Sequence, residues 1–241
     1  VTSIINSPSL DPHSYEATTN DAKLVAKADV VIQNGLGYDS WLNKVVKSAQ
    51  PDDQTVLTVS QLMKQSNGAN EHLWYDLKTM PTLTKRLVTE FSKRDPKHKA
   101  TYQQNGAVYL KKLASLDAQL QQLKAQAKGK QVAVSEPVFD YALAEMGYKV
   151  ANQHFAKAIE DGTDPSPKDI TTMRDLIKTH QIAFLVINKQ EESPIIKQMH
   201  ELADKEGVPV VQVTETLPAK KTYLTWMQQQ FDAVRKAQDS K

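Results

Sequence analysis

Apolar residues along this chain fall into short β-branched runs that alternate with longer segments of helical spacing. In the first part of the chain, three runs predict buried strands, at residues 1–5, 29–35 and 54–60. Two segments between them predict helices, at residues 19–28 and 37–49. Strand, helix and strand joined by short connections are typical of a parallel sheet with helices on its faces.

The same pattern returns in the last part of the chain. Four runs predict strands, at residues 130–136, 148–152, 181–188 and 208–215. Three segments predict the intervening helices, at residues 137–147, 166–180 and 193–207. Each of these helices has a proline in or near its first turn, where proline is tolerated. The pattern therefore predicts an α/β protein of two lobes.

A single long helix is predicted between the lobes, within residues 95–130. Apolar residues recur there at spacings of seven, four, three, four and three, at Tyr102, Tyr109, Leu113, Leu116, Leu120 and Leu123. We expect this helix to bridge the lobes as a rigid connector. The predicted division is an N-terminal lobe at 1–95, a connecting helix at 96–128 and a C-terminal lobe at 129–241.

Composition and charge exclude several classes of function without identifying one. The 241 residues include 30 basic and 28 acidic side chains, a net charge of +2, and no basic cluster that would predict nucleic-acid or membrane-surface binding. The chain has no cysteine, so a metal site would have to use imidazole and carboxylate ligands. No apolar run approaches the roughly 20 residues that span a bilayer.

Four side chains are candidates for such a site. Glu136 and Glu215 each follow a predicted buried strand, and ligand sites in α/β sheets lie beyond the carboxyl ends of strands. His13 and His72 lie in predicted loops that could face the same region. Asp76, four residues after His72, could accept a hydrogen bond from its imidazole and orient it.

Five segments together resemble one known family, the metal-binding solute-binding proteins of manganese and zinc ABC importers (the cluster A-I or ZnuA/TroA-like family). In chain order they are VTSIINSPSLDPHSYEAT, ADVVIQNGLGYDSW, NEHLWYDL, VSEPVFDYALAEMGY and VPVVQVTETLP. The resemblance covers essentially the whole chain. It implies two α/β lobes joined by a long helix, with a metal site between them formed by His13, His72, Glu136 and Glu215.

Two of the implied ligands vary within the family. The position of Glu136 is histidine in many zinc-associated members and glutamate in others. The position of Glu215 is usually aspartate, so the carboxylate here is one methylene longer. Members also have another strand and helix ahead of the segment equivalent to residues 1–5. That segment would carry the export signal and, in Gram-positive relatives, a lipid-anchoring cysteine, so we expect this first lobe to lack its first strand and helix.

The chemistry of the set suits one divalent ion per chain. Two neutral imidazoles and two carboxylates cancel the charge of a dication, which avoids burying an unpaired charge. The carboxylates favour Mn²⁺, whereas the general order of metal affinities favours Zn²⁺, so both stay open. The resemblance implies a monomeric, extracytoplasmic carrier, a surface lipoprotein or a periplasmic protein, that delivers the ion to a membrane ABC permease.

Two other classes of protein are less well supported. A metallohydrolase usually leaves one metal position open for water, whereas four protein ligands would close the site. The chain also has no HExxH, no G-x-S-x-G and no glycine-rich phosphate loop. A surface adhesion role, described for some relatives, is an alternative that the sequence leaves open.

Overall fold

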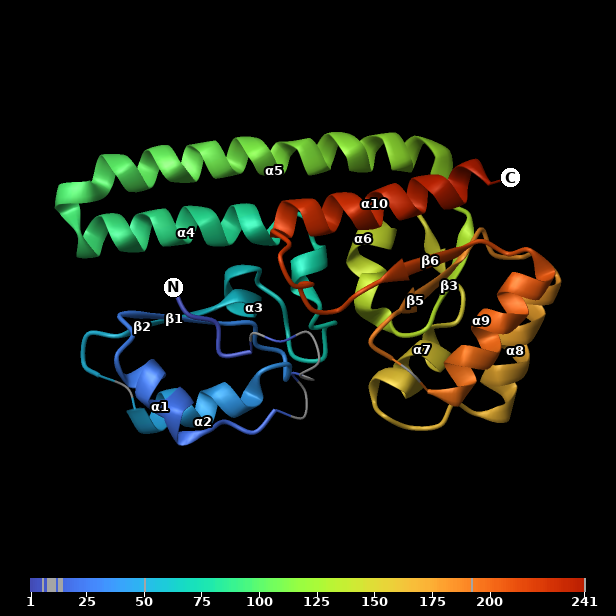
Figure 1. Ribbon diagram of the computed structural model, residues 1–241, viewed down its shortest axis with the longest axis horizontal. Coiled ribbons are helices and arrows are strands. Elements are labelled where there is room, and N and C mark those ends of the chain that lie inside the picture. The colour runs from blue at the N-terminus through green and yellow to red at the C-terminus, as the bar shows by residue number, and fades with distance from the viewer. Residues whose placement is uncertain (6, 8–11, 13–14, 50, 192, 241) are drawn as a thin grey trace. The chain divides into compact units, whose positions relative to one another are not determined.

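The computed structural model describes residues 1–5, 7, 12, 15–49, 51–191 and 193–240, and Figure 1 shows its elements. The chain divides into two compact units. The first combines Val1–Leu73 with Lys78–Gly106, and the second combines Trp74–Leu77 with Ala107–Lys241. The chain therefore enters the second unit for four residues, returns to the first, and enters the second again within its longest helix.

The first unit is a parallel strand pair with helices. Its described elements are α1 (Thr19–Ala26), β1 (Val30–Gln33), α2 (Ser40–Ala49), β2 (Thr55–Thr58), α3 (Val59–Leu62), α4 (Thr79–Arg94), η2 (Pro96–His98) and the start of α5 (Lys99–Ala127). Strands β1 and β2 pair in parallel, with Val31 opposite Val56. Helices α1 and α2 cover one face of the pair and bury Val25, Leu42 and Val45 against it.

The strand predicted at residues 1–5 is wrong. These residues form no strand, and among the described residues β1 pairs with β2 alone. Val1 is fully exposed, while Ile4 packs as a half-buried side chain beside the core of α1 and α2. A β-branched run expresses a local preference only, and it becomes a strand where a neighbouring backbone completes its hydrogen bonds.

The second unit contains a four-stranded parallel sheet in the order β4-β3-β5-β6. Its described elements are β3 (Gln131–Val134), η3 (Pro137–Phe139), α6 (Asp140–Glu145), β4 (Lys149–Val150), α7 (Gln153–Glu160), α8 (Pro167–Lys178), β5 (Leu185–Asn188), α9 (Pro194–Glu206), β6 (Val210–Val213) and α10 (Tyr223–Asp239). Every residue of β5 is buried, as expected for a central strand covered on both faces. The α/β class and the parallel sheets predicted from the sequence are confirmed.

Helices cover both faces of this sheet (Figure 1). Helices α7, α8 and α9 lie on one face, where Phe155, Met173 and Met199 pack against the strand residues Ala133 and Leu185. Helices α6 and α10 lie on the other face. Neither α7 nor α10 was predicted from the sequence, although α10 buries Trp226, Met227 and Phe231.

The long helix is confirmed as α5, after the short η2 turn. Its leucine seam is buried, with Leu116, Leu120 and Leu123 each 1% exposed. In the second unit α5 and α10 lie side by side (Figure 1), where Gln119 Nε2 donates to Asp232 Oδ1 at 2.8 Å. No helix among the described residues is long and apolar enough to cross a membrane.

Candidate metal-binding residues

His72 lies in the first unit, immediately before the η1 turn (Leu73–Tyr75), and its side chain is fully buried. Its backbone N–H donates to Asn70 Oδ1 at 2.9 Å, and its ring Nδ1 lies 2.8 Å from the same oxygen. A backbone N–H can only donate, so the Asn70 atom is the amide oxygen, and the ring nitrogen that contacts the same oxygen must donate as well. Nδ1 is therefore a donor in this contact, and Nε2 is the ring nitrogen left to coordinate a metal ion when the imidazole is neutral.

The loop between β1 and α2 supports this histidine. Asn34 Nδ2 donates to the carbonyl oxygen of Glu71 at 2.8 Å, which fixes the residue before His72. The carboxylate of Asp39 in turn accepts from the backbone N–H groups of Asn34 at 2.6 Å and Gly35 at 2.8 Å. Burial raises the pKa of Asp39, while these two backbone hydrogen bonds oppose that shift.

Gly35 is required by the path of this loop. Its φ is +87°, and a Cβ at this position would lie too close to the Ser60 side chain. The Tyr38 ring, from the same loop, meets the His72 ring edge-on with centroids 6.3 Å apart. The glycine-containing segment NGLGYD thus serves a structural purpose beside the imidazole.

Glu136 lies in the second unit, two residues beyond β3, and its side chain is 9% exposed. Pro137 follows at the first position of η3, so the chain turns sharply just after the carboxylate. Asn188, the last residue of β5, donates from Nδ2 to Glu136 Oε1. The Asn188 backbone N–H also donates to Ser135 Oγ at 3.0 Å, which locks the two strand ends together.

Glu215 lies two residues beyond β6 and is half-buried. Since β5 separates β3 from β6, Glu136 and Glu215 leave the same edge of the sheet about 10 Å apart in strand spacing. Asn188 occupies the position between them. This edge is the carboxyl end of a parallel sheet, as the strand assignments predicted.

The four predicted ligands do not all fall in the same part of the described structure. His13 lies outside the described residues, His72 belongs to the first unit, and Glu136 and Glu215 belong to the second. Asn70 Oδ1 is the described hydrogen-bond partner of His72 Nδ1, and the sequence analysis had not named it. This contact is a local turn in which the Asn70 amide bonds to the residue two places on, and the polar residues before His72 were its only signal in the sequence.

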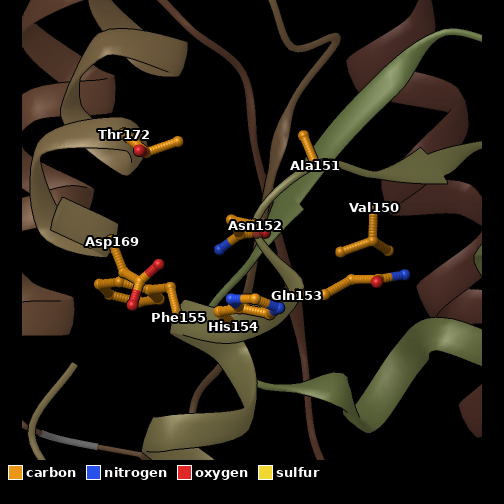
Figure 2. A pocket seen from close by; sticks show the side chains of 8 residues that line it. All are labelled: Val150, Ala151, Asn152, Gln153, His154, Phe155, Asp169 and Thr172. Carbon is orange, nitrogen blue, oxygen red and sulfur yellow. The ribbon is translucent and has the colours of Figure 1, made fainter. Parts of the chain in front are cut away.

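The hollow in Figure 2 is a different feature of the second unit. It measures about 230 Å³ and is formed by residues 150–155 with Asp169 and Thr172. None of the four predicted ligands lines it. Asn152, at its centre, is fixed by hydrogen bonds to both backbone groups of Val134, at 3.0 Å and 2.8 Å.

The sequence is similar to those of known metal-transport proteins. A sequence model of the family "Zinc-uptake complex component A periplasmic" matches residues 1–237. The manganese ABC transporter substrate-binding lipoprotein PsaA of Streptococcus pneumoniae is 25% identical over 215 residues, covering 83% of this chain and 67% of that relative. The iron ABC transporter substrate-binding lipoprotein MtsA of Streptococcus pyogenes serotype M1 is 28% identical, with the same coverage.

The fold has solved counterparts as well. The periplasmic zinc binding protein TroA from Treponema pallidum superposes with a TM-score of 0.76 at 19% identity, covering 97% of this chain and 89% of that one. In parallel α/β sheets, ligands bind beyond the carboxyl ends of the strands, which is where Glu136 and Glu215 lie. The chain belongs to the zinc-uptake complex component A family, which confirms the resemblance found in the sequence.

Proposed function

We propose that this chain is the extracytoplasmic solute-binding protein of a metal importer. It binds one divalent transition metal ion, Mn²⁺ or Zn²⁺, and delivers it as a monomer to an ABC permease in the membrane. Family membership supports the class of protein, and the relatives PsaA and MtsA are named as substrate-binding lipoproteins of such importers. Those names favour a chain that works outside the cytoplasm, as a surface lipoprotein or in the periplasm.

The observation that carries the proposal is the state of His72. The Asn70 oxygen holds Nδ1 as a donor, so Nε2 of a fully buried imidazole keeps the lone pair that a metal ion requires. Glu136 and Glu215 supply two negative charges, and His13 is the proposed fourth ligand. The complete set would neutralise a dication, in accordance with the cost of burying an unpaired charge.

The donor types restrict the metal without selecting one. No thiolate is available, so soft ions such as Cu⁺ are disfavoured. Imidazole and carboxylate ligands suit Mn²⁺, Zn²⁺ and Fe²⁺, and the two relatives are named for manganese and for iron. We favour Mn²⁺ or Zn²⁺ for this chain because the family is named for zinc uptake and PsaA for manganese.

Calorimetric titration of chelator-stripped protein with Mn²⁺ and then Zn²⁺ tests the proposal. We expect one tight site per chain in the parent protein. The His72→Ala variant should weaken binding at least about 100-fold, since loss of groups that merely orient a ligand already costs 10–100-fold. The matched control is His98→Ala, because His98 is an exposed histidine paired with Asp95. An absence of tight binding, or equal binding by His72→Ala and the parent protein, would contradict the proposal.

A further inference from the structure

Every polar group of Thr214, the residue before Glu215, has a hydrogen-bond partner within the second unit. Its carbonyl oxygen accepts from the Tyr75 hydroxyl at 2.5 Å. Its backbone N–H donates to Gln230 Oε1 at 3.2 Å, and its side-chain Oγ1 accepts from Trp226 Nε1 at 2.9 Å. The backbone that leads into the proposed ligand is therefore held from three directions.

Tyr75 is the centre of this arrangement. Its hydroxyl lies 2.6 Å from Gln230 Oε1 as well as 2.5 Å from the Thr214 carbonyl oxygen, so its single hydrogen is shared between two acceptors. Its ring is fully buried and meets Phe139 edge-on, with centroids 5.0 Å apart. The Trp226 ring is tilted against it at 56°, with the centroids 5.6 Å apart. Tyr75 therefore contacts η3, α10 and the segment after β6.

The position of each partner in the sequence is informative. Tyr75 follows His72 by three residues, Phe139 follows Glu136 by three residues, and Thr214 precedes Glu215 by one. A single buried side chain thus joins the segments adjacent to three of the proposed ligands. A buried tyrosine that only fills the core needs one hydrogen-bond partner, and its contacts need not lie next to proposed ligands in the sequence.

We propose that Tyr75 is a positioning residue of the metal site: its hydroxyl holds the backbone that carries Glu215, and its ring supports the turn that follows Glu136. This inference rests on the proposed function. Metal affinity depends on how well the ligands are held by groups that do not touch the ion. Removing the hydroxyl frees the Thr214 carbonyl group, so the Glu215 carboxylate loses part of its fixed direction.

The hydroxyl is available as a donor throughout the working pH range. Burial raises the pKa of Tyr75 well above its ordinary value, and the nearby Glu215 carboxylate acts in the same direction. The Gln230 hydrogen bond opposes this shift but does not cancel it. The tyrosine is therefore a hydrogen-bond donor at neutral pH, as the contact with the Thr214 carbonyl oxygen requires.

The chain offers a closely matched control in Tyr148. This tyrosine is also buried in the second unit, also meets a phenylalanine edge-on, at 4.9 Å from Phe184, and also hydrogen-bonds a glutamine of α10, Gln238, at 2.7 Å. It differs in having no hydrogen bond to the Thr214 backbone. Tyr148→Phe therefore reproduces the loss of a buried hydroxyl without touching the segment that carries Glu215.

The experiment compares Tyr75→Phe, Tyr148→Phe and the parent protein. Affinities for Mn²⁺ and Zn²⁺ are measured by competition with a chelator, well below the unfolding temperature, and thermal unfolding is followed on the metal-free proteins. We expect both variants to unfold at lower temperature. We expect Tyr75→Phe to bind each metal about 10-fold more weakly and Tyr148→Phe to stay within about twofold of the parent protein.

A second variant keeps the test decisive if Tyr75→Phe does not fold. Trp226→Phe removes the donor to Thr214 Oγ1 while leaving an aromatic ring, and we expect it too to weaken metal binding more than Tyr148→Phe does. If the folded variants lose stability but bind metal as the parent protein does, Tyr75 is a structural residue only and the inference is overturned. A parent protein that binds neither metal overturns the proposed function itself, which separates the two failures.

Discussion

At the scale of single residues, amides do much of the positioning around the proposed ligands. Asn70 holds His72 Nδ1, and Asn188 donates to the Glu136 carboxylate. Both are neutral, so neither adds charge to a set that already balances a dication. Their shared property is geometric, since the side-chain oxygen of each amide also accepts from a backbone N–H two residues on, that of His72 or of Gln190.

Replacing Asn70 tests whether this geometry matters. Asn70→Ala removes the acceptor for Nδ1, which frees the ring to rotate and to exchange tautomers. We expect about 10-fold weaker metal binding, in the range seen when the partner of a ligating histidine is removed. Asn70→Asp should retain or improve binding, because a carboxylate can accept the same hydrogen bond. Calorimetry on both variants measures the difference.

Asp76→Ala provides the comparison for that experiment. The sequence offered Asp76 as a possible acceptor for the His72 imidazole, whereas the described contact of Nδ1 is with Asn70. We expect the aspartate variant to bind metal more nearly as the parent protein does. A loss equal to that of Asn70→Ala would show that the effect is not particular to the residue that contacts Nδ1.

At the scale of elements, α4 is joined to β2 by one charged cluster in the first unit. Glu90 Oε1 accepts from Thr55 Oγ1 at 2.7 Å and from Arg94 Nε at 2.9 Å, and Glu90 Oε2 lies 3.1 Å from Arg86 Nη1. Arg94 also donates to the carbonyl oxygen of Asp53, at 2.5 Å. The Thr55 hydrogen bond, followed by those of Arg94 and the charges of both arginines, lowers the pKa of Glu90 despite its burial.

Glu90→Gln should therefore destabilise the first unit. A carboxyl group whose folded pKa is lowered stabilises the protein above its unfolded pKa, and this contribution disappears as pH falls through the folded pKa. We expect a loss of about 1–2 kcal/mol at neutral pH, the usual value of a few charged hydrogen bonds, and a smaller difference near pH 3. Urea unfolding of both proteins at the two pH values measures it.

The control for this prediction is the exposed pair of Lys157 and Asp161 on α7. It has the same i,i+4 spacing and an N–O distance of 2.6 Å, but both side chains are more than half exposed. Surface pairs of this kind contribute little, so Asp161→Asn should shift stability by less than about 0.5 kcal/mol. Equal effects at the two sites would contradict a special role for Glu90.

Some elements could be predicted from the local sequence pattern alone, and others could not. The leucine seam of α5 and the buried run of β5 were recognised because each has one clear period or a continuous apolar stretch. Residues 1–5 have the composition of a strand yet form none, because a strand depends on a neighbour that no local pattern describes. Helix α10 was missed although its buried residues have helical spacing.

At the scale of the whole molecule, metal binding should appear as stability. A ligand that binds only the folded state at 100 times its Kd stabilises it by about 2.7 kcal/mol. For a chain of this length that corresponds to a rise of roughly 5–10 °C in unfolding temperature. Calorimetry with Mn²⁺ or Zn²⁺ should show the rise, and the same concentration of Ca²⁺ should not. A rise that persists in His72→Ala would indicate binding elsewhere.

The rise should also depend on pH. Protons compete with the metal for the imidazole and carboxylate donors, so binding weakens on acidification. We expect the metal-dependent part of the unfolding temperature to shrink between about pH 7.5 and 5.5, where histidines ordinarily change charge. Repeating the calorimetry across this range with and without metal isolates that part from the intrinsic acid sensitivity of the protein.

Local sequence determined the class of this protein: alternating strands and amphipathic helices, and acidic residues just after β3 and β6. These features depend on periodicity and on neighbours within a few residues, so the sequence pattern predicts them. Tertiary structure alone decided that Asn188 holds Glu136 and that Tyr75 contacts the backbone before Glu215, whereas Asn70 holds His72 within one local turn. Contacts between distant residues depend on how whole elements pack, and the contact at Asn70 depends on how one short turn folds. Periodicity and residue type along the chain therefore did not predict either kind of contact.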